Sequence, residues 1–305
     1  MVKDLIIKYV WLVDTIYKAG QITFEEINQK WIDQEMDDKP IAKRTFHKWR
    51  NAIEEIFDLN IECKREGNYP YYIENKEDIK RNTLRNWLLK TLSVSNLLMN
   101  SQTIKNRILL EEIPSGQEHL STVMEALKTN TRLRITYHGY GWVESNTFDV
   151  DPYCVKLFRQ RWYLVARSAT SPYKEKGPHI YAFDRILSLQ TTGETFEMSK
   201  DWDAEAFFED CFGIITDQSV KVQTVKLKVS AWQANYIRDL KLHETQEEIE
   251  RNEEYSIFSL RIRPTFDFLQ ELLWNGERME VLEPLELRKE IGKKIELMWN
   301  KYKQE

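Results

Sequence analysis

The chain of 305 residues is 42% hydrophobic and 30% charged, and its formal net charge is −5 at pH 7. This length allows roughly two or three globular domains. The negative charge excludes a protein that coats nucleic acid through overall positive charge, so any DNA contact must come from a local basic patch.

The three cysteines, Cys63, Cys154 and Cys211, lie far apart, and the sequence has no C-x-x-C motif. This pattern favours neither a disulfide framework nor a zinc site, and reduced thiols in the cytoplasm fit it best. No apolar run approaches the ~20 residues that a membrane-spanning helix needs, and the N-terminus lacks the cleavage site of a signal peptide. We therefore expect a cytoplasmic protein with no metal, no cofactor and no membrane contact.

The N-terminal residues predict two helices in succession. From Asp4 to Ala19, apolar residues recur every three or four positions, which is typical of an amphipathic helix, and Gly20 is a suitable C-cap. Thr23 then begins a second helix, because Thr23 and Glu26 have the spacing of a capping box.

The third predicted helix, Ala42 to Asp58, is the candidate recognition helix. Phe46 and Trp49 mark its buried face. From Ile41 to Arg50 the sequence has four basic residues and no acid, although the N-terminal region is otherwise acidic. A positive N-terminal half on the last of three short helices is what a recognition helix needs to enter the major groove of DNA.

A β-hairpin is predicted next, with strands at residues 61–65 and 69–73 around a turn that contains Gly67-Asn68. Three helices followed by a hairpin resemble a winged helix-turn-helix. The alternative is a small helical domain with a solvated charged face. The predicted DNA-binding residues lie on the third helix and on the wing: Lys43, Arg44, Thr45, His47, Lys48, Arg50, Lys64 and Arg65.

A long helical pattern follows from Glu77 to Met99 and links the N-terminal domain to the rest of the chain. It carries more apolar residues than one neighbouring element requires. Packing within its own chain and packing against a second subunit explain this excess equally well. Ile108 to Ile113 has the composition of a short strand, and Pro114-Ser115-Gly116 interrupts the pattern.

The central part of the chain is predicted to be rich in strands. After a short helix at residues 117–128, strands are expected at residues 133–137, 142–150, 153–157, 161–167, 179–183 and 186–190. Short strands at such close spacing favour a small barrel or a curled sheet.

The strand Arg161 to Arg167 has two different faces, because side chains alternate along a strand. Trp162, Leu164 and Ala166 share one face, and Arg161, Tyr163, Val165 and Arg167 share the other. The second face is suited to bind an anion, since arginine offers a planar fork for phosphate and tyrosine adds a ring and a hydroxyl. The alternative is a solvated outer face on which the arginines extend into water.

Trp162-Tyr163-Leu164, followed by an aromatic-x-x-Asp-Arg-Ile box at Tyr181 to Ile186, resembles the WYL domain of bacterial transcription regulators. Pro152 and the strand end Tyr137-His138 also stand where this family usually has a proline and a polar strand end. The resemblance covers roughly residues 117–200. It implies an Sm-like or SH3-like small β-barrel that senses a ligand.

Basic and aromatic residues alternate through this region, as they do in sites for single-stranded nucleic acid or nucleotides, where rings stack on bases and arginines hold phosphates. Asp184 is suited to orient Arg185 or to accept a hydrogen bond from a ligand, and a structural ion pair is the alternative. The predicted ligand-binding residues are His138, Lys156, Arg159, Arg161, Tyr163, Arg167, Tyr181, Asp184 and Arg185.

The C-terminal region follows a linker helix at residues 199–211 and has the order β-α-β-β-α-β. Strands are expected at residues 222–229, 243–250, 255–262 and 279–282, helices at 231–240 and 266–274, and a terminal helix after Pro284 up to Tyr302. This order predicts a ferredoxin-like sandwich. It resembles the extension that commonly follows WYL domains, including the run Gly276…Val281-Leu282-x-Pro284-x-x-Leu287-Arg288.

Together these patterns predict an α+β protein with a winged helix-turn-helix at residues 1–75, a helical linker at 76–116, a WYL domain at 117–200, a linker helix at 201–219 and a C-terminal extension domain at 220–305. No motif of a nucleophile elbow, a phosphate-binding loop or a zinc protease is present, so we expect no enzyme. The prediction is a homodimeric transcription regulator that binds a double-stranded operator and responds to single-stranded nucleic acid or a nucleotide. A nucleic-acid-binding interaction protein and a WYL-regulated nucleic-acid enzyme are the alternatives.

Overall fold

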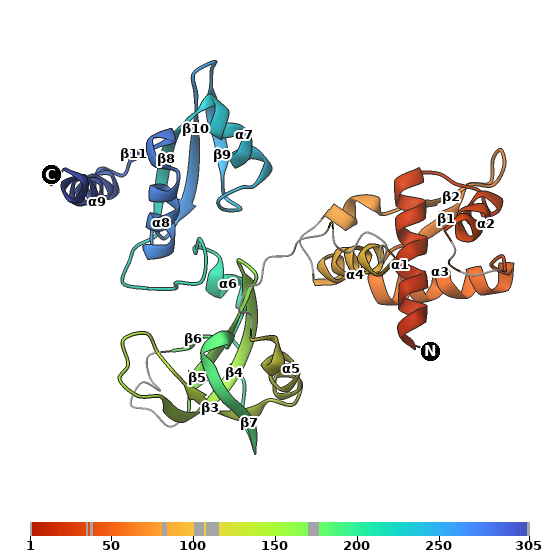
Figure 1. Cartoon of the computed structure of the whole chain (residues 1–305), viewed down its shortest axis with the longest axis horizontal. Helices are drawn as coiled ribbons and strands as arrows, with labels where there is room; N and C mark the ends of the chain where they lie inside the picture. The colour runs from red at the N-terminus through yellow and green to blue at the C-terminus, as the bar shows by residue number, and fades with distance from the viewer. Residues whose placement is uncertain are drawn as a thin grey trace. The chain divides into compact units, whose positions relative to one another are not determined.

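The computed structural model describes residues 2–34, 36, 39–80, 84–100, 107, 116–169 and 177–303. The chain divides into two compact units, residues 1–111 and 112–305 (Figure 1). The expected strand at Ile108 to Ile113 lies outside the described residues. The domain boundaries predicted within each unit stay predictions.

The first unit contains three helices and a hairpin. Its elements are α1 (Val2–Ala19), α2 (Phe24–Asp33), α3 (Lys43–Phe57), β1 (Ile61–Cys63), β2 (Tyr71–Ile73), the 3-10 helix η1 (Lys76–Lys80) and α4 (Leu84–Asn100). Ile22 and Tyr71 exchange backbone hydrogen bonds, so the hairpin is attached to the loop before α2. Trp31, Phe46 and Trp49 lie in one buried core between the helices. This arrangement confirms the predicted winged helix-turn-helix.

Local signals in this unit act as expected. Thr23 accepts a hydrogen bond from the backbone of Glu26, and the Glu26 carboxylate accepts one from the backbone of Thr23, which completes the predicted capping box. These hydrogen bonds lower the pKa of Glu26. The predicted helix from Glu77 to Met99 is found as η1 and α4, with residues 81–83 outside the described part between them.

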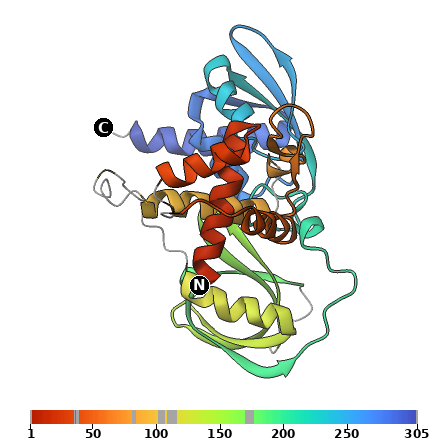
Figure 2. The same ribbon diagram turned by 90° about the vertical axis from the view of Figure 1, so that its right-hand side faces the viewer.

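The second unit begins with a helix that packs on a curled antiparallel sheet (Figure 1 and Figure 2). Its elements are η3 (Gln117–His119), α5 (Leu120–Thr129), β3 (Thr131–Tyr137), β4 (Asn146–Phe158), β5 (Arg161–Ser168), β6 (His179–Ala182), η5 (Phe183–Arg185) and β7 (Ile186–Thr195). The strand order is β6-β5-β4-β3-β7, and a 3-10 turn joins the two outer strands. This is the order of a small SH3-like or Sm-like barrel, as predicted.

One prediction for this sheet was wrong in detail. The strands expected at residues 142–150 and 153–157 are a single strand, β4, which pairs with β3 along its first part and with β5 along its second part. The register shifts between Pro152 and Cys154. Because proline has no backbone N–H and a bulge bends a strand, Pro152 lets β4 turn from one half of the sheet to the other without a break.

The C-terminal domain has a four-stranded antiparallel sheet of order β11-β8-β10-β9. Its elements are β8 (Gln223–Ser230), α7 (Ala231–Asp239), β9 (Glu247–Arg251), β10 (Tyr255–Ile262), α8 (Phe266–Trp274), η6 (Gly276–Arg278), β11 (Met279–Glu283) and α9 (Leu285–Tyr302). The order confirms the predicted ferredoxin-like fold. Two elements are shorter than predicted: the linker helix is only α6 (Ala204–Phe208), and hydrogen bonds among His243, Thr245 and Gln246 form a turn before β9.

A buried ion-pair network joins β3, β4 and β5. The Asp151 carboxylate has an exposed fraction of 0%, and its two oxygens accept hydrogen bonds from Arg132 Nε at 2.8 Å and from Arg167 Nη2 at 3.2 Å. Arg132 also pairs with Glu194 at 2.7 Å. Because register places Asp151 directly opposite Arg167, the pairing follows from the strand alignment.

Replacing Asp151 with alanine is expected to destabilise the protein by about 2–3 kcal/mol, because Arg167 loses its carboxylate and Arg132 keeps only the exposed Glu194, so two half-buried guanidinium groups each lose a charged hydrogen bond. Asp149→Ala is the control, since Asp149 pairs with the more exposed Arg134 and its loss should cost clearly less. Chemical denaturation followed by circular dichroism measures both changes. Equal losses for the two variants would contradict a special role of the buried network.

Candidate functional site

The first part of the candidate ligand site is built around Arg185, at the end of η5. Its guanidinium lies over the ring of Tyr140, 3.9 Å from the centroid, and over the ring of Tyr137, 4.9 Å from the centroid. Arg185 Nε donates a hydrogen bond to the backbone oxygen of His138 at 3.1 Å. Two rings and one backbone acceptor therefore hold this cation at the ends of β3 and β6.

The second part is the ion pair between Arg161 and Asp184, whose Nη2 and Oδ2 atoms are 2.5 Å apart. The Arg161 guanidinium also lies 5.8 Å from the centre of the Tyr163 ring. Burial tends to lower the pKa of Arg161, but hydrogen bonds to Asp184 and Tyr140 outweigh it, so the pKa is raised and the cation is maintained. Asp184 thus pairs with Arg161 and not with the adjacent Arg185.

This ion pair retains hydrogen-bonding capacity. Arg161 Nε and Asp184 Oδ1 are buried and have no hydrogen-bond partner among the residues that the structure describes. A buried donor or acceptor without a partner costs roughly 1–3 kcal/mol, so such atoms usually bond to water or to a ligand. The pair therefore retains one donor and one acceptor whose hydrogen-bonding capacity is not used among the described residues.

A cavity of about 1090 Å³ adjoins this cluster, with aromatic walls. Tyr137 packs edge-on against Trp142 and Tyr181, at centroid distances of 5.9 Å and 5.3 Å, and Phe148 lies 5.7 Å from Tyr181. Burial raises the pKa of Tyr181 to about 12, so its hydroxyl stays protonated at neutral pH. The cavity combines flat apolar rings with the Arg185 cation at its edge.

Sequence reasoning missed Tyr137, Tyr140 and Trp142 as site residues. The available signal was the run Tyr137-His138-Gly139-Tyr140-Gly141-Trp142, in which aromatic residues alternate with glycines. Gly139 is required for close packing, because a Cβ atom there would lie 2.4 Å from the Trp142 ring. The sequence pattern predicts a strand end at Tyr137-His138 and a new strand from Trp142, which leaves only Gly139-Tyr140-Gly141 as the connecting loop.

Of the predicted ligand residues, the structure brings together Arg161, Tyr163, Tyr181, Asp184, Arg185 and the backbone of His138. The other three lie elsewhere. Arg167 binds Asp151, and Arg159 binds Glu271 of α8 at 2.5 Å. Lys156 donates to the Gly213 oxygen at 2.7 Å and lies over the Phe208 ring, and burial lowers its pKa.

The face of β5 that carries Tyr163 and Val165 is neither an open platform nor a solvated surface at its centre. Val165 is fully buried in a small second core with Tyr153 and Phe196. Chain segments after β7 pack on this face and cover it. Only its Arg161 end belongs to the arginine and aromatic cluster, which consists of Arg161, Arg185, Asp184 and the rings of Tyr137, Tyr140 and Tyr163. Burial raises the pKa of Tyr163 there.

The candidate nucleic-acid interface is the N-terminal half of α3. Lys43, Arg44, His47 and Lys48 are exposed, and Thr45 is half-buried. Ala42 is the N-cap, no described side chain caps the helix there, and the first turn contains no acid. The first backbone N–H groups therefore add to the positive charge at this end of the helix.

Arg50 has a structural environment instead. Its Nη2 atom lies 3.7 Å from Glu62 of β1, and its guanidinium lies 5.5 Å from the centre of the Tyr71 ring. It connects α3 to the hairpin. Lys64 and Arg65 are exposed in the turn between β1 and β2, where the prediction placed the wing.

None of the described helices is both long and apolar enough to cross a membrane. Within the described residues, no group of three or more histidine, cysteine, aspartate or glutamate side chains is arranged to hold a metal ion.

Comparison with known proteins identifies two domains and distant structural neighbours. The chain is similar to the proteasome accessory factor B/C of Arthrobacter aurescens, with 15% identity over 94% of this chain and 45% of that one, at a TM-score of 0.36. It thus spans less than half of that protein's length. It is also similar to a CRISPR Cas-related protein, with 12% identity over 98% of this chain and 83% of that one, at a TM-score of 0.39. No curated protein matches the sequence.

Two family profiles match segments of the second unit. The profile described as the WYL domain matches residues 118–191, which include the arginine and aromatic cluster. The profile described as the WCX domain matches residues 221–299, which form the ferredoxin-like sheet and most of α9. The chain therefore belongs to the WYL-domain proteins, with a WYL domain followed by a WCX domain.

Proposed function

We propose that the protein is a DNA-binding transcription regulator whose WYL domain binds single-stranded nucleic acid or a nucleotide as its effector. The observation that supports this proposal is that one chain carries two different surfaces rich in cationic side chains. One is the exposed basic half of α3 on a winged helix fold, and the other is the arginine and aromatic cluster of the WYL domain.

The chemistry of the cluster supports a nucleic-acid effector. Aromatic rings stack on bases, and this stacking contributes roughly 1–3 kcal/mol per base without strong sequence preference. Arg161 and Arg185 supply planar forks for phosphate oxygens. Asp184 Oδ1 is suited to accept a hydrogen bond from a base amine or a sugar hydroxyl. The cavity with its rings is thus suited to a base, Asp184 to a base amine or a sugar hydroxyl, and the two arginines to phosphate.

The proposed regulator is a homodimer that acts on DNA in the cytoplasm. A single recognition helix provides limited affinity, and helix-turn-helix dimers read two half-sites about one helical turn apart. The effector switches the protein only if it binds two arrangements of the dimer with different affinity, because a ligand with equal affinity for both shifts nothing.

The proposal is tested by enrichment of genomic DNA fragments on the purified full-length protein, with and without short single-stranded oligonucleotides. We expect a small set of duplex fragments to be enriched and the oligonucleotides to change their affinity. Uniform recovery of all fragments would favour a nucleic-acid-binding interaction protein without transcriptional control. Turnover of the added nucleic acid would favour an enzyme regulated by its WYL domain.

A further inference from the structure

The C-terminal half of α9 presents an apolar stripe without a partner among the described residues. Ile295, Met298, Trp299 and Tyr302 stand at positions i, i+3, i+4 and i+7 of the helix and are 53%, 48%, 61% and 82% exposed. The stripe continues a buried one, since Leu287 at the start of the helix belongs to the domain core. Figure 1 shows α9 beside β11 at the edge of the C-terminal sheet.

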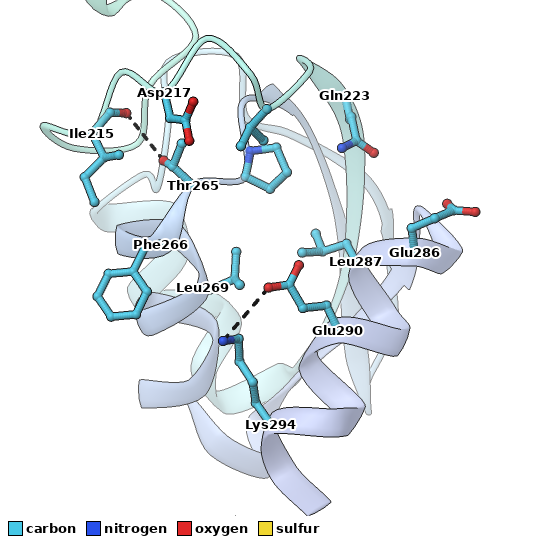
Figure 3. A pocket seen from close by; sticks show the side chains of 12 residues that line it. Ile215, Asp217, Gln223, Thr265, Phe266, Leu269, Glu286, Leu287, Glu290 and Lys294 are labelled. Atoms are coloured by element: carbon cyan, nitrogen blue, oxygen red, sulfur yellow. Dashed lines mark hydrogen bonds and ion pairs between the residues drawn. The ribbon is translucent and has the colours of Figure 1, made fainter. Parts of the chain in front are cut away.

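A groove lies at the other end of the same helix. It has a volume of about 320 Å³, which is of the order of one large aromatic side chain. Leu269 of α8 and Leu287 of α9 point into it, together with the side chain of Glu290 (Figure 3). Asp217 and Glu286 lie on its rim, so the groove has an apolar floor and an acidic edge.

The stripe and the groove have opposite charges around their apolar surfaces. Residues 295–303, which carry the stripe, contain Lys301 and Lys303 and one glutamate. The groove is lined by three carboxylates and by Lys294, which pairs with Glu290 at 3.9 Å. Unlike charges at the edges of an interface guide association and determine which surfaces meet.

We propose that the C-terminal half of α9 docks into this groove of a second copy of the chain, and that the exchange is reciprocal. This proposal rests on the homodimer of the proposed function and assigns its interface. Because each copy carries both surfaces, a two-fold axis between two copies allows each stripe to enter the partner's groove. Such an interface is two-fold symmetric and closes at two copies.

The reciprocal contact also brings opposite charges together. In each contact, Glu286 and Glu290 of one groove would meet Lys301 and Lys303 beside the partner's stripe.

The exposed area is sufficient for a stable dimer. A buried aromatic side chain removes roughly 150–250 Å² from water, so the stripe offers roughly 400 Å² per copy from its two aromatic and two aliphatic side chains. A stripe covers about as much of the partner's surface as it buries of its own, so the two contacts together bury roughly 1,600 Å², which is the usual size of a specific interface. The groove itself receives one aromatic ring of each stripe. Trp299 and Tyr302 are of the residue types that dominate binding energy in such interfaces.

Charge reversal in the full-length protein tests the proposal. One variant carries Glu286→Lys and Glu290→Lys in the groove, and the other carries Lys301→Glu and Lys303→Glu in the C-terminal half of α9. Each variant alone places like charges at both contacts and is expected to be monomeric at concentrations where the natural chain is a dimer. An equimolar mixture pairs opposite charges at both contacts and should form a heterodimer. Light scattering and native mass spectrometry measure these states.

Two further variants complete the test. Trp299→Ala with Tyr302→Ala should weaken the dimer about 100-fold without changing its charge. Glu244→Lys with Glu253→Lys changes exposed acids outside α9 and the groove, and should leave the dimer intact. A dimer that survives both charge-reversed variants, or a mixture that stays monomeric, would overturn the proposed interface.

Measurements on the same variants distinguish a wrong α9 interface from a wrong proposed function. Circular dichroism confirms that each variant is folded, and anisotropy with duplex and single-stranded DNA reports the two binding activities. A dimer unaffected by any α9 change, with normal DNA binding, would overturn only the α9 interface. A natural chain that is monomeric with and without DNA would overturn both the homodimer and this interface.

Discussion

Replacing Arg161 and Arg185 with alanine is expected to abolish binding of single-stranded nucleic acid and to leave the affinity for duplex DNA nearly unchanged. Arg185 lies over two tyrosine rings, and Arg161 is held by Asp184 beside the Tyr163 ring. Loss of both forks removes the cations that would hold a phosphate chain, and a loss of affinity of about 100-fold or more follows if each contributes about 1.5–3 kcal/mol. Fluorescence anisotropy with labelled oligonucleotides measures the change.

A matched double variant makes this result specific. Arg134→Ala with Arg251→Ala removes the same charge from the second unit, and both residues are exposed and lie outside the cluster. We expect this control to retain effector binding within about twofold, because screened surface charges contribute little. A cluster variant that is folded and still fully responsive to the effector would refute this site.

Replacing Lys43 and Arg44 with alanine is expected to weaken binding to duplex DNA and to flatten its salt dependence. Both side chains are exposed in the first turn of α3, where the uncapped helix end adds positive charge. Each lost phosphate contact lowers the slope of log K against log salt by about 0.9, so the slope should fall by about two per bound copy. Titrations at several salt concentrations measure this slope.

The control for the recognition helix is Lys18→Ala with Lys90→Ala, which removes two exposed lysines from α1 and α4 of the same unit. If phosphate contacts are local to α3, this control keeps the salt slope of the natural protein. An unchanged slope in the Lys43 and Arg44 variant would show that α3 does not contact the DNA backbone. Binding of the single-stranded effector should be the same in all three proteins.

Elements with strong local signals were predicted well. The capping box of Thr23 and Glu26 and the apolar face of α3 depend only on residues a few positions apart, so tertiary context has little chance to override them. The order of strands and helices in the C-terminal domain was also correct, because its elements alternate between periods of two and of about 3.6 residues. Errors arose where one strand bends at Pro152 and where the linker helix is short.

The composition of the candidate site was only partly predictable. Alternation along β5 correctly separates the side chains onto two faces, but it does not say which neighbouring strand lies opposite each residue. Register pairs Arg167 with Asp151, and the turn η5 brings Asp184 to Arg161 from 23 positions away. Tyr140 joins the site because its loop folds back over Arg185, and no periodic pattern marks that return.

The sequence by itself therefore determined the fold class, the three folded regions and the two places where basic residues gather. Those properties follow from local propensity, hydrophobic period and charge, which are read along the chain. Only the tertiary structure decided that Arg161 and Arg185 join a common aromatic site while Arg167, Lys156 and Arg159 have structural partners. The reason is physical: a long cationic side chain reaches several angstroms. Its partner therefore depends on strand register and on which distant segments meet in the fold, and not on its neighbours in sequence.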